Sequence, residues 1–519
     1  MTSPPREIEL KLEVPPEAQE PLKKAPAPTG FTSTRATTKT LHSIYFDTPD
    51  QALRLAKISL RVRKVGQSWI QTAKFGTGVT GGLSSAIEVE HAIDGRAVDL
   101  SIIDDPQILR HLVETIDGRP LAETFETVMP RTSRLLTSHD GSRIEIAFDA
   151  GDIKVNGKTS PLAEVEFELL QGSSASLYAA ANGLLGATPF RFSPCSKAER
   201  GFRLAEDNSD NTILPALAAK VVLSTDETVE HAFRNVLRSC LTQIADNRMA
   251  VLASDLPEGP HQLRIGLRRL RSAFRLFKPA LNPHSLTPLN EMAKEIAGHV
   301  GALRDLDVLA EDIVAPLESF RPENLSLEPL LKHLGTTRQV CRADLIDYLG
   351  SEKINTFLFS LAAYTEGRGW LDAENFDQSR LLAASVSAHA DRALDRQWKK
   401  CAKYGSRIDD LAISERHEMR KALKKIRYGI EFFGSLYPKQ EVKPFLKRLK
   451  KLQDIFGYLN DIAMAEKLLD DPIAKGAGAA GVAKAVGFAV GWHEAQSHHM
   501  WQHAKGYWSD TKTVPKFWR

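Results

Sequence analysis

The sequence predicts a chain of two unlike parts: an α+β N-terminal part built on an antiparallel β-barrel or tunnel, then an all-α domain of two duplicated helical bundles. Three observations predict this. Polar and apolar residues alternate with the period of two that is typical of strands in a first stretch from Glu7, and strand signals then dominate from about Thr40 to Glu168. Beyond the polar break Asp207–Asn211, the period becomes 3.6. A basic helical segment then recurs after 417 − 261 = 156 residues, which indicates an internal repeat.

These patterns also set the expected domain boundaries. We expect one domain at 1–206, a linker at 207–220 and a helical domain at 221–512, with halves of about 221–365 and 380–510. A chain of 519 residues that is 42% hydrophobic can bury more than one core. Its net charge of +3 does not by itself indicate a nucleic-acid binder.

Cysteine usage and hydrophobicity indicate the compartment. The four cysteines show no CxxC pairing, which favours neither a zinc site nor a disulfide framework. No apolar segment precedes the charged stretch that begins at Glu7, so we expect no secretory signal. The most apolar stretch, 473–492, is interrupted by Lys475 and Lys484, and we expect a packed helix and no membrane partner. A reduced, cytoplasmic location is therefore expected.

The first strand, Glu7-Ile8-Glu9-Leu10-Lys11, places two acids and a base on one face, because successive side chains of a strand point to opposite faces. The alternation of charged and apolar residues returns in five later stretches, which are 60–63, 72–75, 88–90, 143–149 and 163–169. Their polar faces are almost purely Glu, Asp, Arg and Lys. If the sheet closes into a barrel, these charges point inward, where acids can hold hard cations and bases can hold phosphates.

This ordered set of motifs resembles the CYTH superfamily of triphosphate tunnel enzymes. The resemblance begins at Glu7-x-Glu9-x-Lys11 and spans nearly all of residues 5 to 204. It continues through Tyr45-Phe46-Asp47-Thr48, Leu60-Arg61-Val62-Arg63, Thr80-Gly81-Gly82-Leu83, Glu88-x-Glu90, Glu164-x-Glu166-x-Glu168 and Ser196-Lys197-Ala198-Glu199-Arg200-Gly201. The resemblance implies a triphosphate substrate held in a tunnel.

Residue types within these motifs suggest the site. We expect carboxylates to hold one or two Mg²⁺ or Mn²⁺ ions, and the candidates are Glu7, Glu9, Asp149, Glu164, Glu166 and Glu168. Which of the last three bind metal stays open. We expect the triphosphate to be bound by Lys11, Arg61, Arg63, Lys74, Arg131 and Lys197, with Arg143 as a further candidate.

The expected chemistry is attack of water at the terminal phosphorus, oriented or deprotonated by Lys11 or by a glutamate of the last strand such as Glu166. Glu88 and Glu90 are expected either as metal ligands or as partners of the arginines. Tyr45 and Asp47 are expected to support the strand and its turn.

The helical part carries a basic stripe. His261, Arg264, Arg268, Arg271 and Arg275 are spaced by three and four residues, so they share one helix face. Leu263, Leu267, Leu270, Phe274 and Phe277 follow on the opposite face. The second copy of this helix provides His417, Arg420, Lys424 and Arg427. Neighbouring like charges repel unless an anion screens them, although Asp305 and Asp461 are alternative internal partners.

This half resembles the CHAD domain, through His261-x-x-Arg264, Arg268-Arg269-x-Arg271, Leu303-Arg304-Asp305-x-Asp307 and the second set from His417. The resemblance implies binding of inorganic polyphosphate in a basic channel. In the second half Asn460 replaces Arg304 and Ala463 replaces Asp307, so the halves need not contribute equally.

Three functions follow from these observations. The first is a metal-dependent inorganic triphosphatase that splits tripolyphosphate into diphosphate and phosphate, with a helical module that binds longer polyphosphate. The second is a non-catalytic polyphosphate-binding adaptor. The third is an adenylyl cyclase, for which the sequence offers no evident base pocket. The basic stripes lack interleaved aromatics, which disfavours nucleic acid, and the sequence does not indicate the oligomeric state.

Overall fold

The computed structural model describes residues 6–76, 79–80, 82–193, 195–206, 213–372, 374–470 and 480–519. The chain forms two compact units. The tunnel unit comprises Met1–Ile213 with Gly350–Arg368, and the helical unit comprises Leu214–Leu349 with Gly369–Arg519. Residues 207–212, which include most of the polar break and part of the predicted linker, lie outside the described residues.

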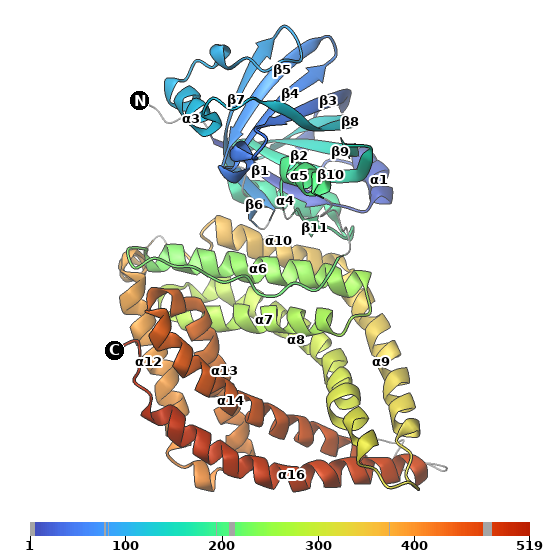
Figure 1. The fold of residues 1–519 in the computed structure, drawn as a ribbon, viewed down its shortest axis with the longest axis vertical. Coiled ribbons are helices and arrows are strands. Elements are labelled where there is room, and N and C mark those ends of the chain that lie inside the picture. Colours follow the sequence, from blue (N-terminus) through green and yellow to red (C-terminus); the bar gives the residue numbers. More distant parts are fainter. Residues whose placement is uncertain are drawn as a thin grey trace. The chain divides into compact units, whose positions relative to one another are not determined.

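Eight of the described strands close the tunnel unit into an antiparallel barrel (Figure 1), as the sequence predicts. In ring order they are β1 (Arg6–Glu13), β10 (Lys158–Gln171), β9 (Arg143–Val155), β8 (Ala122–Ser138), β3 (Thr37–Asp47), β4 (Ile58–Val65), β5 (Ser68–Phe75) and β7 (Leu83–Ile93). The pairing of β7 with β1 closes the ring. Three short strands extend it: β2 (Phe31–Ser33) on β8, β6 (Val79–Thr80) on β7 and β11 (Arg191–Phe192) on β1.

The strands turn their charged faces inward because helices cover their apolar faces. Leu10 and Leu12 of β1 and Val165 and Phe167 of β10 are fully buried, on the faces opposite the charged side chains. One apolar cluster joins β3, β4 and β5 to α2 (Ala52–Leu55) and α3 (Pro106–Ile116). A second cluster joins β3, β8 and β9 to α5 (Lys197–Ala205). Burial of the apolar outer face therefore fixes which side chains face the interior.

The helices of the tunnel unit agree with the sequence in part. Proline-rich residues 15–28 form only η1 (Pro16–Ala18) and the six-residue α1 (Gln19–Lys24), and α4 spans Ser174–Leu185. Helix α3 was not expected within the strand-rich region. Its N-cap is Asp105, whose carboxylate accepts bonds from the next amides, and Pro106 occupies the first turn.

The tunnel unit also includes α10 (Glu352–Glu366), which follows the first helical repeat in the sequence. Phe359 of α10 stacks on Phe190 with ring centroids 4.5 Å apart. The buried amide of Asn355 donates to the carbonyls of Gly186 and Thr188 at 2.8 Å each. These contacts attach the helix to the end of α4 and to the segment before β11.

The helical unit consists of long helices (Figure 1), which are α6 (Val229–Ala253), α7 (Glu258–Phe277), α8 (Pro283–Asp307), α9 (Glu328–Leu349), α11 (Phe376–Ala383), α12 (Val386–Gly405), α13 (Ile413–Phe433), α14 (Lys439–Ala465) and α16 (Ala480–Thr513). A π-helical turn, η4 (Val308–Val314), follows α8. Helices α8 and α14 begin 439 − 283 = 156 residues apart, the displacement of the sequence repeat. No described helix is long and apolar enough to cross a bilayer.

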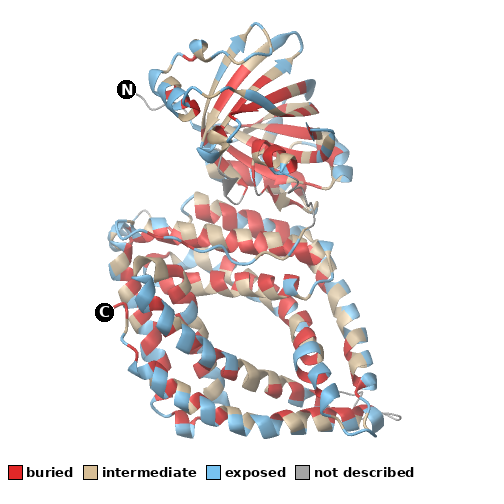
Figure 2. Ribbon diagram, in the orientation of Figure 1, coloured by how far each residue is buried: buried red, intermediate tan, exposed pale blue. Residues whose placement is uncertain are grey.

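Helices α7 and α13 have the amphipathic character that the sequence indicates. Leu263, Leu267 and Leu270 of α7 are at most 1% exposed, and Figure 2 shows buried residues along both α6 and α7, which pack together. Arg269 also faces α6, where its guanidinium donates to Gln243 Oε1 at 2.6 Å. It is therefore separate from the basic stripe on the other face.

Candidate functional site

The barrel of the tunnel unit encloses a cavity of about 480 Å³ whose walls are mostly charged. Its basic lining residues are Arg6, Lys11, Arg61, Arg63, Lys74, Arg131 and Lys197. Its acidic lining residues are Glu7, Glu9, Glu88, Glu90, Glu145, Glu166 and Glu168. All six residues predicted to bind the triphosphate therefore line one cavity.

Strand register brings these side chains together. Lys11 of β1 lies opposite Glu166 of β10. Two residues away, Glu9 lies opposite Glu168, and Glu168 lies opposite Glu145 of β9. Because side chains two residues apart share a face, these positions all point into the barrel. One row is thus mixed in charge, and the next row consists of three carboxylates.

Glu166 is at the centre of a buried network of charges. Its carboxylate lies 2.8 Å from Lys11 Nζ, 2.5 Å from Lys197 Nζ and 2.5 Å from Arg131 Nη2. Burial acts to raise the pKa of Glu166, but these three cations hold that pKa well below its usual range. The pKa of Lys11 is raised despite burial, through Glu166 and Glu9. Both groups therefore stay charged at neutral pH, and neither can take a proton from water.

Lys197, at the start of α5, connects this network to two further carboxylates. Its ammonium lies 2.9 Å from Asp149 and 2.7 Å from Glu164. Arg131 donates to Asp149 through two nitrogens, and Arg200 reaches Glu164 at 3.1 Å. Asp149 and Glu164 are fully buried and lie behind the residues that line the cavity. The structure therefore pairs these two predicted metal ligands with basic side chains.

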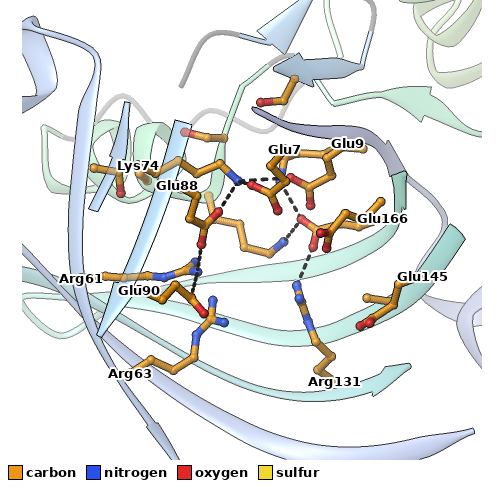
Figure 3. A pocket seen from close by; sticks show the side chains of 18 of the residues that line it. Glu7, Glu9, Arg61, Arg63, Lys74, Glu88, Glu90, Arg131, Glu145 and Glu166 are labelled. Atoms are coloured by element: carbon orange, nitrogen blue, oxygen red, sulfur yellow. Dashed lines mark hydrogen bonds and ion pairs between the residues drawn. The ribbon is translucent and has the colours of Figure 1, made fainter. Parts of the chain in front are cut away.

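A second network surrounds Lys74 (Figure 3). Its ammonium forms an ion pair with Glu7 and lies 3.5 Å from Glu9 and 2.9 Å from Glu88. Burial, the hydrogen bond with Glu88 and the charge of Glu9 raise the pKa of Glu7 to about 8. Glu88 also lies 3.2 Å from Arg61, so it is a partner of the basic side chains here.

Two side chains of opposite sign lack full compensation within the cavity. Burial, with the nearby charges of Arg61 and Arg131, lowers the pKa of Arg63 to about 10. Burial, with the nearby charges of Glu9 and Glu145, raises the pKa of Glu168 to about 7. A pKa shifted toward the neutral form by like charges marks a position where a counter-ion would be favourable. The cavity therefore has one place that favours an anion and another that favours a cation.

Several lining residues were not predicted as site residues, and Tyr45 and Glu145 are two of them. Tyr45 was expected only to support its strand, yet it lines the cavity and its phenol interacts with Arg61. Glu145 shares the inward face of 143–149, and this alternation was the available signal. Arg143 is exposed and outside the cavity lining. Asp47 accepts hydrogen bonds from Thr48, Leu53 and Arg54 amides, so it holds the turn into α2.

Carboxylate oxygens are the donors that hard divalent cations prefer. Within the described residues, no three acidic, histidine or cysteine side chains converge closely enough to hold an ion as they stand. The reason is visible at Glu9, which lies 2.7 Å from Lys11 and also faces Lys74. At Glu168, burial and then the charges of Glu9 and Glu145 raise the pKa of the carboxyl, and Lys74 opposes them only in part.

The basic stripe of the helical unit has fewer acidic partners. Arg264 forms an ion pair with Asp305 at 2.6 Å, whereas Arg420, its counterpart in the repeat, donates to the neutral side chain of Asn460 at 3.0 Å. Arg271 donates to the neutral side chain of Asn290 at 3.4 Å. The corresponding arginines of the two halves therefore differ in their partners, one acidic and one neutral. The replacement of Arg304 by Asn460 had already indicated that the halves need not contribute equally.

Other predicted residues of the stripe lie in different settings. His261 and Arg268 are half-buried, and both line a second cavity, within the helical unit. Arg275 and His417 are exposed at the ends of their helices. Arg427 lies 2.8 Å from Glu431 and so has an internal partner. The uncompensated charge is concentrated around the middle of α7 and α13.

Comparison with known families agrees with this geometry. Residues 5–202 match the CYTH domain, and residues 235–470 match the CHAD domain. The chain consists of a CYTH domain followed by a CHAD domain. The CYTH match lies within the tunnel unit, and the CHAD match lies in the helical unit apart from Gly350–Arg368 with α10, which belong to the tunnel unit.

Two known proteins are similar to parts of this CYTH–CHAD chain. The inorganic triphosphatase of Haemophilus influenzae is 32% identical over 201 residues, which is 38% of this chain and 55% of that protein. The chain thus spans about half the length of this curated relative. The crystal structure of the CHAD domain from the plant Ricinus communis is 28% identical, with a TM-score of 0.50, and covers 58% of this chain and 97% of that one.

Proposed function

We propose that the CYTH domain is a metal-dependent inorganic triphosphatase that splits tripolyphosphate into diphosphate and phosphate, and that the CHAD domain binds inorganic polyphosphate. The observation that carries the first part is that one cavity is lined both by an arginine, Arg63, and by a carboxylate, Glu168, whose charges are only partly compensated. A polyanion that carries divalent cations satisfies both charges at once. The similarity to an inorganic triphosphatase supports the same reaction.

The basic side chains of the cavity would bind and orient the phosphates. Arg61, Arg63 and Arg131 are planar guanidiniums that can each bind two phosphate oxygens. Lys11, fixed in its charged form by Glu166 and Glu9, would stabilise the negative charge that develops at the terminal phosphate. Glu166 would act as a positioning residue, since its three basic partners leave it no proton affinity at neutral pH.

Water attack at the terminal phosphorus then breaks one phosphoanhydride bond, and the bridging oxygen leaves with diphosphate. Such a reaction requires mainly in-line positioning and charge neutralisation. No serine or cysteine nucleophile is required. The buried networks around Glu166 and Lys74 would keep the basic side chains fixed, so that little reorganisation is needed during the reaction.

The donors that suit a metal are Glu7, Glu9 and Glu168, with Glu145 beside Glu168. The fit rests on the acidic row Glu9–Glu168–Glu145, in which burial, with the like charges of Glu9 and Glu145, raises the pKa of Glu168. Mg²⁺ or Mn²⁺ bound there would neutralise charge on the phosphate oxygens. Asp149 and Glu164 are less suitable, because Lys197 already neutralises both.

Phosphate release by the purified full-length protein tests this proposal. Tripolyphosphate, ATP and long-chain polyphosphate would each be supplied with Mg²⁺, with Mn²⁺ and with chelator. We expect metal-dependent release that is fastest with tripolyphosphate. Absence of release from all three, with retained polyphosphate binding, would identify a non-catalytic binding protein instead. Dominant conversion of ATP to a cyclic nucleotide would identify a cyclase.

A further inference from the structure

The two copies of the basic helix differ at one central position. Arg268 of α7 corresponds to Lys424 of α13, since 424 − 268 = 156. A guanidinium remains charged in proteins, whereas an amine can lose its proton when it is buried. Only the second copy therefore has a side chain at this position that can titrate near neutral pH.

Lys424 lies in a crowded basic environment. It is half-buried and lines a cavity of about 1100 Å³ within the helical unit, together with Arg268, His261 and Tyr428. No carboxylate of the described residues lies within ion-pair distance of its ammonium. Arg268 has a buried Nε without a hydrogen-bond partner in the part of the chain that the structure describes. Both features indicate that a counter-ion is missing.

Burial is the largest cause of the lowered pKa of Lys424, and nearby like charges lower it further. Burial together with Arg268, Arg420 and Arg264 lowers the pKa of Lys424 to about 6, and Asp461 opposes them only in part. The titratable and charged groups that surround it come from five elements. Arg264 and Arg268 of α7, Arg420 of α13 and Asp461 of α14 act on its pKa, and Asp305 of α8 acts on Arg420. The same cavity is also lined by His261 of α7, Asp312 of η4, Arg427, Tyr428 and Glu431 of α13, and Lys439, Lys443 and Asp454 of α14.

We infer that Lys424 is uncharged in the free protein and takes up a proton from solvent when polyphosphate binds between α7 and α13. The inference rests on the proposed polyphosphate binding and describes how that site is regulated. A bound polyanion supplies the negative charge that the cluster lacks, so the ammonium becomes the favoured form. The anion and one proton therefore bind together.

The direction of the pH dependence follows from this linkage. Below the pKa of free Lys424 the amine is already charged, and binding draws no proton. Above the pKa of free Lys424, binding must take up a proton from solvent, and the proton concentration falls as pH rises. The affinity for polyphosphate therefore decreases with rising pH until the pKa of Lys424 in the bound state is reached. One pH unit within that window corresponds to about a tenfold change in affinity.

Matched variants separate Lys424 from other titrating groups. Lys424→Arg places the residue of the first repeat in the second and keeps the charge at every pH. Lys424→Met keeps the length and removes the charge. His261 and His417, whose pKa values are also lowered, remain in both variants and contribute equally.

The experiment is calorimetric titration of full-length protein with long-chain polyphosphate, with chelator present to prevent turnover. Titrations at pH 7 in buffers of different ionisation enthalpy give the number of protons taken up. We expect wild type to take up about one proton more than either variant. Between pH 7 and pH 8, wild-type affinity should decrease about tenfold more than that of Lys424→Arg.

Each outcome has a separate meaning. Equal proton uptake by wild type and Lys424→Arg, with normal binding, would overturn the inference and leave the proposed function intact. Absence of polyphosphate binding by wild type would overturn both. Should Lys424→Arg fail to fold by circular dichroism, Lys424→Met provides the same comparison, and uptake equal to that of wild type would again overturn the inference.

Discussion

The tunnel cavity and the basic cluster of the helical unit contain similar basic side chains in opposite electrostatic settings. In the tunnel, Lys11 and Lys197 each lie within 3 Å of at least two carboxylates. In the helical unit, Lys424 and Arg268 have like charges as their main neighbours. The first arrangement pairs most basic groups with carboxylates of the same unit. In the second arrangement Asp461 and Asp305 offset the like charges only in part.

This difference suggests different tasks. Fixed charges of both signs suit a reaction in which a short anion and its metal ions must be held in one orientation. A cluster of like charges suits the binding of a long anion that need not be held in one position. Salt weakens such binding because it screens the charges. Changes to single residues should therefore affect the two regions in different ways.

The largest effect is expected from breaking the matched charges of the tunnel. Lys197→Met would leave Asp149, Glu164 and Glu166 buried without their shared cation. Loss of one partner of a buried charged network costs about 3–5 kcal/mol of unfolding free energy, and phosphate release should cease. Urea unfolding measures the first effect. Lys23→Met, which removes only a pair with the exposed Glu20, should change stability by less than about 1 kcal/mol. An equal loss of stability in Lys197→Met and Lys23→Met would contradict a stabilising role of the buried charges around Lys197.

Removal of one carboxylate that lines the cavity should affect the proposed phosphate release and not the proposed polyphosphate binding of the CHAD domain. Glu9→Gln keeps the shape of a 5% exposed side chain but removes its charge. Phosphate release from tripolyphosphate should decrease about 100-fold or more, the scale of losing one electrostatic group of an active site. Steady-state kinetics measures this effect. The control is Glu20→Gln on the exposed surface of α1, and undiminished turnover by Glu9→Gln would remove the acidic row from the proposed site.

Changes in the basic cluster of the helical unit should weaken polyphosphate binding and leave phosphate release unchanged. Arg264→Ala combined with Arg420→Ala removes the corresponding residues of both copies. Affinity for long-chain polyphosphate should decrease about tenfold to a hundredfold, because each charge-assisted contact contributes about 1.5–3 kcal/mol before repulsion is relieved. Turnover of tripolyphosphate should be unchanged. Arg380→Ala on α11, where the arginine is exposed and paired with Asp377, is the control, and an equal effect from it would exclude a specific cluster.

The smallest effect concerns the backbone next to Lys11. Gly82 has φ +77°, and a Cβ there would lie 2.6 Å from Phe192 and 2.9 Å from the carbonyl oxygen of Lys11. Gly82→Ala should therefore cost about 1–3 kcal/mol of stability and displace β1 slightly, which lowers turnover but not polyphosphate affinity. Thermal unfolding and phosphate release measure the two effects. Gly95→Ala, with open space around the position, should change neither.

Much of the fold was predictable because the charge alternation is local. The faces of Glu9 and Lys11 follow from the period of two alone, and the helical repeat follows from residue spacing. The pairing of charges was not predictable, because strand register and barrel closure decide it. Asp149 and Glu164 were expected as metal ligands, yet the register and α5 place Lys197 between them. Helix α3 was missed although Asp105-Pro106 is a common start signal for a helix.

The most direct test of the account compares two activities in two variants. Phosphate release from tripolyphosphate with Mg²⁺, and binding of long-chain polyphosphate with chelator, would be measured for Glu9→Gln and for the Arg264→Ala, Arg420→Ala double variant. The account predicts crossed losses: the first variant binds polyphosphate without turnover, and the second retains turnover with weakened binding. Loss of both activities in both variants would contradict two separate sites.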